Sequence, residues 1–330
     1  MTATPLLDLH DLHVSVRHRG TRRTLVRDVS LSVDAAESIG VVGESGSGKS
    51  MTIKAAMRLL PPGATAEGHV RFEGLDVLKL DRRELARYRS RDVALIHQDP
   101  RAHINPTRTI AQFVTEGVVH TGQMTRDEAI ERACDLMADI GIPDARRRMG
   151  QFPHQLSGGL LQRVMIVAAL LPSPRLVFAD EPTTALDVTV QSDVMAILLE
   201  QIRDRRVSML FVTHDLDLAA AVTDRLAVMY AGTIVESGTS TEIYQRPLHP
   251  YTAGLLQSRP STAKVRRPTA IPGRPVAAYE VDQGCSFAPR CPFATDRCRA
   301  ERPDRRLVED RSVACHRVEE IADLLKERAT

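Results

Sequence analysis

The chain has 330 residues, of which 43% are hydrophobic and 26% charged, so it can bury a sizeable core in one large domain or two ordinary ones. Its 44 lysines and arginines nearly balance 42 aspartates and glutamates, which argues against a dedicated nucleic-acid binder. No apolar run approaches the roughly 18 residues of a membrane-spanning helix. The first ten residues lack a secretory signal pattern, so the expected compartment is the cytoplasm.

The first part of the chain predicts an α/β fold. Residues 10–16 and 24–33 alternate apolar and polar side chains, which indicates an antiparallel β subdomain. Short, apolar, largely β-branched runs, typical of buried parallel strands, follow at 38–42, 93–96, 176–179 and 209–213. Helical spacing covers 50–60, 126–140, 158–171 and 188–203. A stretch rich in Pro and Arg at 259–275 then marks a boundary, which predicts one region at 1–258 and a second at 259–330.

A phosphate-binding loop is the strongest local signal. The strand at 38–42 runs into a segment that fits the pattern Gly, any four residues, Gly, Lys, Ser: Gly43, Glu44, Ser45, Gly46, Ser47, Gly48, Lys49 and Ser50. The glycines let backbone amides point inward at the start of a helix, where they bind an anion. Lys49 adds a positive charge for the β and γ phosphates, and Ser50 places a hydroxyl on Mg²⁺.

Polar residues end the later strands. Asp180 and Glu181 follow the run at 176–179, at the edge of a parallel sheet where ligands bind. We expect Asp180 to hold Mg²⁺ and Glu181 to polarise the attacking water. His214 and Gln98 also follow strands, so an imidazole could reach the γ phosphate and an amide could coordinate Mg²⁺.

The segment Leu156, Ser157, Gly158, Gly159 resembles the signature motif of ABC-type ATPases, with the acidic strand some 20 residues further on. The resemblance implies a RecA-like core, an antiparallel β subdomain and a helical subdomain. It also implies that Ser157, Gly158 and Gly159 bind ATP held by an opposite subunit. By the same resemblance Gln98 forms the Q-loop, residues 185–187 with Asp187 the D-loop, and His214 the switch histidine.

Longer strings narrow the resemblance to ATP-binding subunits of dipeptide, oligopeptide and nickel importers. These are GESGSGKS, HQDPRAHINP, DEPTTALDVTVQ and PLHPYT, together with a Cys-containing C-terminal extension. The implied partners are two membrane permeases contacting residues 98–115, a second ATPase chain and an extracytoplasmic binding protein. The chain would lie on the cytoplasmic face of the membrane. Nickel or another small solute remains an alternative cargo, and an ABC ATPase acting on ribosomes or DNA is the rival class.

Two positions depart from the family pattern. Leu160 stands where the signature motif usually has Gln or, in this subfamily, Met. Val16 stands where the family carries an aromatic residue that stacks on adenine.

Four of the five cysteines lie close together near the end of the chain. Cys285, Cys291, Cys298 and Cys315 follow one another at uneven spacings that lack the short knuckles of a zinc ribbon. A four-thiolate set with long loops favours a [4Fe-4S] cluster, which some members of the resembled subfamily carry; Zn²⁺ is the alternative. Its expected role is structural, with redox sensing also open. Cys134 lies in a helical pattern as a small apolar residue.

Overall fold

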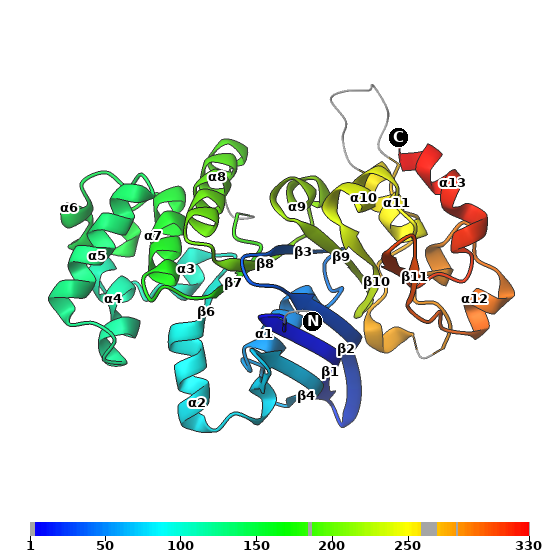
Figure 1. The fold of residues 1–330 in the computed structure, drawn as a ribbon, viewed down its shortest axis with the longest axis horizontal. Coiled ribbons are helices and arrows are strands. Elements are labelled where there is room, and N and C mark those ends of the chain that lie inside the picture. Colours follow the sequence, from blue (N-terminus) through cyan, green and yellow to red (C-terminus); the bar gives the residue numbers. More distant parts are fainter. Residues whose placement is uncertain (1–3, 184–186, 259–268, 282, 330) are drawn as a thin grey trace. The chain divides into compact units, whose positions relative to one another are not determined.

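A computed structural model describes residues 4–183, 187–258, 269–281 and 283–329 (Figure 1). The chain forms two compact units. The first contains Met1–Asp34, Ser38–Lys79 and Phe211–Thr330, and the second contains Ala35–Glu37 and Leu80–Leu210. The phosphate loop and the C-terminal extension therefore share one compact unit. No helix in the described ranges is long and apolar enough to cross a membrane.

The predicted antiparallel subdomain is confirmed in the first unit. Strands β1 (Leu7–His18) and β2 (Thr21–Val33) pair antiparallel, and β1 also pairs antiparallel with β4 (Ala64–Phe72). The short β5 (Leu75–Asp76) completes the sheet in the order β2-β1-β4-β5. Alternation places Leu7 and Leu9 in the core, and after a register irregularity at Asp11, whose φ is +47°, it resumes with Leu12 and Val14.

A second sheet in this unit carries the phosphate loop. Strand β3 (Ser38–Val42) pairs in parallel with β9 (Arg225–Tyr230), and β10 (Thr233–Thr239) pairs antiparallel with β9. The extension adds β12 (Arg311–Val313) to β10 and β11 (Arg306–Val308) to β12. The helices of this unit are α1 (Lys49–Ala56), α9 (Leu216–Val222), α10 (Ser240–Gln245), α11 (Pro250–Gln257), α12 (Asp296–Ala300) and α13 (Val318–Ala329).

Helix α1 ends earlier than predicted. The pattern indicated a helix to residue 60, but α1 stops at Ala56 and Arg58 takes a left-handed backbone with φ of +53°. Pro61 and Pro62 follow, and a proline disfavours helical backbone in the residue before it. The helical spacing therefore continues past the point at which the backbone leaves the helix.

The second unit contains two parallel strands and several helices. Strand β6 (Val93–Ile96) runs parallel to β7 (Leu176–Asp180), and β8 (Ser208–Thr213) leads the chain back into the first unit. Buried apolar side chains fill both β6 and β7. The helices are α2 (Arg82–Arg87), α3 (Pro100–His103), α4 (Ile110–His120), α5 (Arg126–Asp139), α6 (Ala145–Met149), α7 (Gly158–Leu170) and α8 (Val188–Asp204).

The extension is built onto the phosphate-loop unit by shared apolar packing. Leu248 packs with Val313 and Val318, and helix α11 contributes Ala253 to a cluster with Ile321 and Leu325 of α13. A buried pair reinforces this join: the Glu236 carboxylate on β10 lies 3.6 Å from the Arg311 guanidinium on β12. A short tail thus obtains a core that it could not build alone.

His249 caps helix α11 from a buried position. Its Nδ1 accepts a hydrogen bond of 3.1 Å from the Tyr251 amide, and the residue is 1% exposed. Only a neutral ring can accept at Nδ1. Burial lowers the pKa of His249 from 6.5 to about 3.

We expect His249 to make the fold acid-sensitive. Because its folded pKa lies below the unfolded value, its contribution to stability is complete above pH 6.5 and is lost as the pH falls toward 3. Urea unfolding should show a loss of up to about 1.4 kcal/mol per pH unit from this one group below pH 6.5. His249→Asn, which keeps a capping oxygen, should lose this slope, whereas the exposed control His120→Asn should keep it. Equal slopes in all three proteins would contradict the assignment.

Candidate functional site

The candidate residues are divided between the two units. The phosphate loop and His214 belong to the first, whereas Gln98, the signature segment, Asp180, Glu181 and Asp187 belong to the second. Two residues of the expected D-loop, 185 and 186, lie outside the described residues.

The phosphate loop has backbone geometry that only glycine adopts easily. Gly46 and Gly48 have φ of +79° and +107°, in the left-handed region. A Cβ added at Gly43 would lie 2.1 Å from the Met229 carbonyl oxygen, so a side chain is excluded there. A Cβ at Gly46 would meet nothing within 4 Å, so the loop faces open space at that point.

Polar groups in the loop fit an anionic ligand. Helix α1 begins at Lys49 with Gly48 as its N-cap, and glycine has no side chain that could cap the first turn in place of an anion. The Ser47 hydroxyl is buried and, within the described part of the chain, has no hydrogen-bond partner. The buried Lys49 ammonium donates to the carbonyls of Gly43 and Glu44, at 2.7 Å and 3.1 Å. A bound phosphate would offer an acceptor to the Ser47 hydroxyl. It could also replace the carbonyls as the acceptor for the Lys49 ammonium.

Neighbouring elements hold the loop in place. The Gly232 amide donates to the Ser47 carbonyl at 2.8 Å, and the Glu44 amide donates to the Tyr251 hydroxyl at 2.8 Å. His214 lies just beyond β8, with an exposed side chain, at the end of the strand predicted to present it.

The acidic strand end lies in the second unit. Asp180 is the last residue of β7 and is half-buried. Glu181 follows with a left-handed backbone, φ of +46°, which is uncommon for a residue with a side chain and is often found at functional sites. Gln98 is exposed two residues after β6. Carboxylate, amide and hydroxyl oxygens are ligands that Mg²⁺ accepts, so the donor types of Asp180, Gln98 and Ser50 fit this ion.

Two helices of this unit begin at predicted site residues. Ser157 caps α7, and its Oγ accepts from the Leu160 amide at 3.3 Å. Asp187 caps α8, and its carboxylate accepts from the Val190 amide at 3.1 Å. An added Cβ at Gly159 would lie 2.6 Å from Val190, so the two helix starts approach closely only because residue 159 is glycine. Leu160 uses only its backbone in the cap, so the departure from the motif at this position leaves the cap intact.

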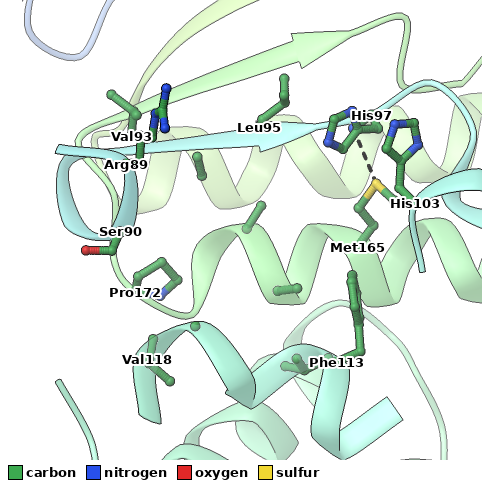
Figure 2. Close-up of a pocket in the computed structure, with 15 residues that line it drawn as sticks. Arg89, Ser90, Val93, Leu95, His97, His103, Phe113, Val118, Met165 and Pro172 are labelled. Atoms are coloured by element: carbon green, nitrogen blue, oxygen red, sulfur yellow. Dashed lines mark hydrogen bonds between the residues drawn. The ribbon is translucent and has the colours of Figure 1, made fainter. Parts of the chain in front are cut away.

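A groove follows β6 and is bordered by α4 and α7 (Figure 2). Its volume is about 340 Å³, and its lining includes His97, His103, Phe113, Val114, Met165 and Pro172. The rings of His97 and His103 stack at 3.7 Å, and the His97 amide donates to Met165 Sδ at 3.3 Å. The sequence indicated residues 98–115 as a contact surface but gave no sign of this groove. Most of its lining comes from residues far apart in the chain.

The four clustered cysteines interact electrostatically. Burial raises the pKa of Cys291 to about 11 and that of Cys315 to about 12, and the charges of neighbouring thiolates add to both shifts. The Cys285 amide donates to the Cys298 carbonyl at 2.8 Å. In the described ranges, however, no three His, Cys, Asp or Glu side chains are grouped closely enough to hold a metal ion. The structure therefore does not confirm the predicted metal ligation.

The structure shows contacts of Tyr279 and Arg290, two residues of the extension. Val16 lies opposite Arg23 on β2, and the Arg23 guanidinium lies 4.9 Å from the ring of Tyr279 in the extension. Sequence reasoning missed this ring, and it also missed Arg290, whose side chain contacts Glu44 of the phosphate loop. Arg290 lies in the string APRCP and Tyr251 in PLHPYT, so the residues were visible but their contacts were not.

Comparison with known proteins agrees with these features. The ABC transporter family model matches residues 26–184, and the model for the oligopeptide/dipeptide transporter C-terminal region matches residues 235–298. The oligopeptide transport ATP-binding protein OppD of Bacillus subtilis is 42% identical over 88% of this chain and 82% of its own length. The dipeptide transport ATP-binding protein DppD of Haemophilus influenzae is 41% identical over 94% of this chain and 95% of its own.

Solved structures share the fold. The ATP-binding cassette MJ0796, a dimer in a post-hydrolysis state with ADP and Pi, has a TM-score of 0.63 and 25% identity, covering 71% of this chain and 98% of that one. CbiO1 of Clostridium perfringens, part of the transporter complex cbiONQ, has a TM-score of 0.63 over 73% of this chain and 91% of that one. At 23% identity, CbiO1 shows the fold alone.

Proposed function

The chain belongs to the ATP-binding subunits of ABC transporters, in the oligopeptide and dipeptide branch, and from that premise we propose that it binds and hydrolyses ATP to power peptide import. The observation that carries the substrate class is the extent of the match. Relatives named for peptide transport align over nearly the whole chain, and the family of the extension is itself that of peptide transporters. Nickel or another small solute is the alternative cargo, because no described residue marks a cargo site on this chain.

The phosphate loop would bind the β and γ phosphates of ATP through its amides, the Ser47 hydroxyl and Lys49. Ser50, Gln98 and Asp180 would hold Mg²⁺, which neutralises charge on the terminal phosphates when it is bound. Glu181 would polarise the attacking water, and His214 would approach the γ phosphate. The open space at Gly46 and the orphan Ser47 hydroxyl support the role of the phosphate loop.

The signature segment would complete a site on a second ATPase chain. Ser157, Gly158 and Gly159 begin a helix whose amides suit an anion, and Asp187 begins a second helix close by. The relative MJ0796 is dimeric, which supports an active pair of chains. The pair here would be two copies or two related chains. Val16 offers no ring for adenine, so the phosphates would carry most of the affinity.

The β6–α4–α7 groove would receive a permease helix. Its walls are largely apolar, and it lies beside Gln98, so insertion of a helix there would couple the membrane subunits to the nucleotide site. The full assembly would contain two permeases, a second ATPase and an extracytoplasmic peptide-binding protein, with this chain on the cytoplasmic face of the membrane.

Substituting the proposed catalytic carboxylate tests the mechanism. Glu181→Gln keeps the shape of the side chain but removes the base, so phosphate release by the assembled transporter should fall at least about 100-fold while ATP remains bound. Glu200→Gln, an exposed change on α8, is the matched control and should hydrolyse ATP normally. Unchanged turnover in Glu181→Gln would refute the assignment of the base.

The four clustered cysteines would hold a [4Fe-4S] cluster, with Zn²⁺ as the alternative. Because like charges raise each other's pKa, the four can all be thiolates only around a cationic centre. A four-iron cluster is wider than a single ion and holds its ligands further apart. The electrostatic interaction among the four cysteines supports a shared site, and their long, uneven spacings in the sequence favour the cluster over Zn²⁺.

Metal analysis of protein purified without oxygen distinguishes these cases. We expect iron and sulfide in equal amounts in the wild-type chain and their loss in Cys298→Ser. Cys134→Ser, which changes the half-buried thiol of α5, should retain both. Zinc without iron would overturn the cluster assignment.

A further inference from the structure

An ion pair joins the Cys-rich extension directly to the phosphate loop. Arg290 ends the turn Ala288–Arg290, and its Nη1 donates to Oε2 of Glu44 at 2.6 Å. Its Nη2 donates to Oε1 of the same carboxylate at 3.1 Å. The guanidinium thus engages both oxygens of the second residue in the phosphate loop. Both residues belong to the first unit, so this contact lies within one compact body.

The Arg290 side chain is enclosed and fully engaged. It is 4% exposed, against 25% for Glu44, and its Nε donates to the Pro272 carbonyl at 2.8 Å. Burial acts to lower the pKa of Arg290, but hydrogen bonds to Glu44 and Tyr230 outweigh it and raise that pKa. A two-pronged Arg–carboxylate contact fixes direction as well as distance. The pair therefore holds Glu44 in one orientation.

Glu44 is held at its backbone as well as at its side chain. Its amide donates to the Tyr251 hydroxyl, and the Tyr251 ring packs against Tyr230 and Phe287, with centroids 4.6 Å and 5.4 Å away. Its carbonyl accepts from the Lys49 ammonium at 3.1 Å. Glu44 is therefore the point at which the extension, the aromatic cluster and the phosphate-binding lysine meet.

We propose that Arg290 is a positioning residue for ATP binding, acting through Glu44 to hold the phosphate loop in its binding shape. The extension is then a working part of the nucleotide site and more than an appended module. Arg290 also directly precedes Cys291, so any change at the cysteine group is one peptide unit away from the residue that holds the loop. The inference rests on the proposed role of the loop in binding ATP.

The test measures MgATP affinity in the full chain for Arg290→Lys, Arg290→Ala and Glu44→Gln. A loop that is no longer preorganised should bind ATP about tenfold more weakly in Arg290→Ala and Glu44→Gln. Arg290→Lys keeps the positive charge but cannot make the two-pronged contact, so the affinity of this variant for ATP should lie between those of the wild type and Arg290→Ala. In the assembled transporter the loss should be in KM for ATP, with kcat nearly unchanged, because the loop binds phosphate in the ground state as well.

The matched control is Arg274→Ala. Arg274 makes an equally two-pronged pair in the same extension, at 2.8 Å and 2.9 Å, but its side chain is 72% exposed and its partner is Glu280 of the extension instead of a phosphate-loop residue. Its ATP affinity should equal that of the wild type. If Arg290→Ala fails to fold, Arg290→Lys decides the question, because it keeps a positive charge beside Glu44 and leaves neither member of the pair as an uncompensated charge.

The outcomes separate this inference from the proposed function. ATP affinity in Glu44→Gln and Arg290→Lys equal to that in Arg274→Ala would overturn the positioning role. Failure of the wild-type chain to bind ATP more tightly than Lys49→Ala would instead refute the nucleotide site itself. Both the nucleotide site and the positioning role are supported if the wild-type chain binds ATP more tightly than Lys49→Ala and if the Glu44 and Arg290 variants bind it more weakly than Arg274→Ala.

Discussion

A glycine-rich loop that must present its amides to an anion has to be held open by its surroundings, and much of this structure serves that constraint. The left-handed glycines at 46 and 48 allow the required turn but contribute no side chains to fix it. The shape is maintained instead by hydrogen bonds with Gly232, Tyr251 and Arg290. The amides and Lys49 are then positioned before nucleotide arrives, so less ordering is needed on binding.

The extension is attached at more places than a linker-borne domain would be. It adds two strands to the sheet of β3 and β9, packs α13 on α11 and buries Arg311 against Glu236. Removing one partner of such a buried pair leaves an uncompensated charge, which typically costs about 3–5 kcal/mol. Loss of the extension would therefore disturb the unit that contains the phosphate loop. A shared core explains why residues after 258 and the loop belong to one compact unit.

The local parts of the site could be predicted from the sequence because their chemistry is encoded in short strings. A strand, a glycine loop and a helix start are adjacent in the chain, and so are β7 and its terminal carboxylate Asp180. Arg290 and Glu44 are 246 residues apart in the chain, and neither a local motif nor a periodic pattern in the sequence indicates that they are in contact. The groove beside β6 is likewise assembled from distant segments. The end of α1 was misplaced because side-chain spacing reports which residues face the core, whereas the left-handed backbone of Arg58 decides where the helix stops.

This ATPase is proposed to work as one part of a membrane importer, and the identity of the proteins bound to it tests that role. The measurement is a pull-down of the tagged full chain from gently solubilised membranes, with identification of every protein recovered. We expect recovery of two permeases with several membrane spans, a second ATPase chain and a solute-binding protein that binds peptides. Recovery of ribosomal or DNA-bound partners without permeases would contradict the transport function while leaving the ATPase chemistry in place.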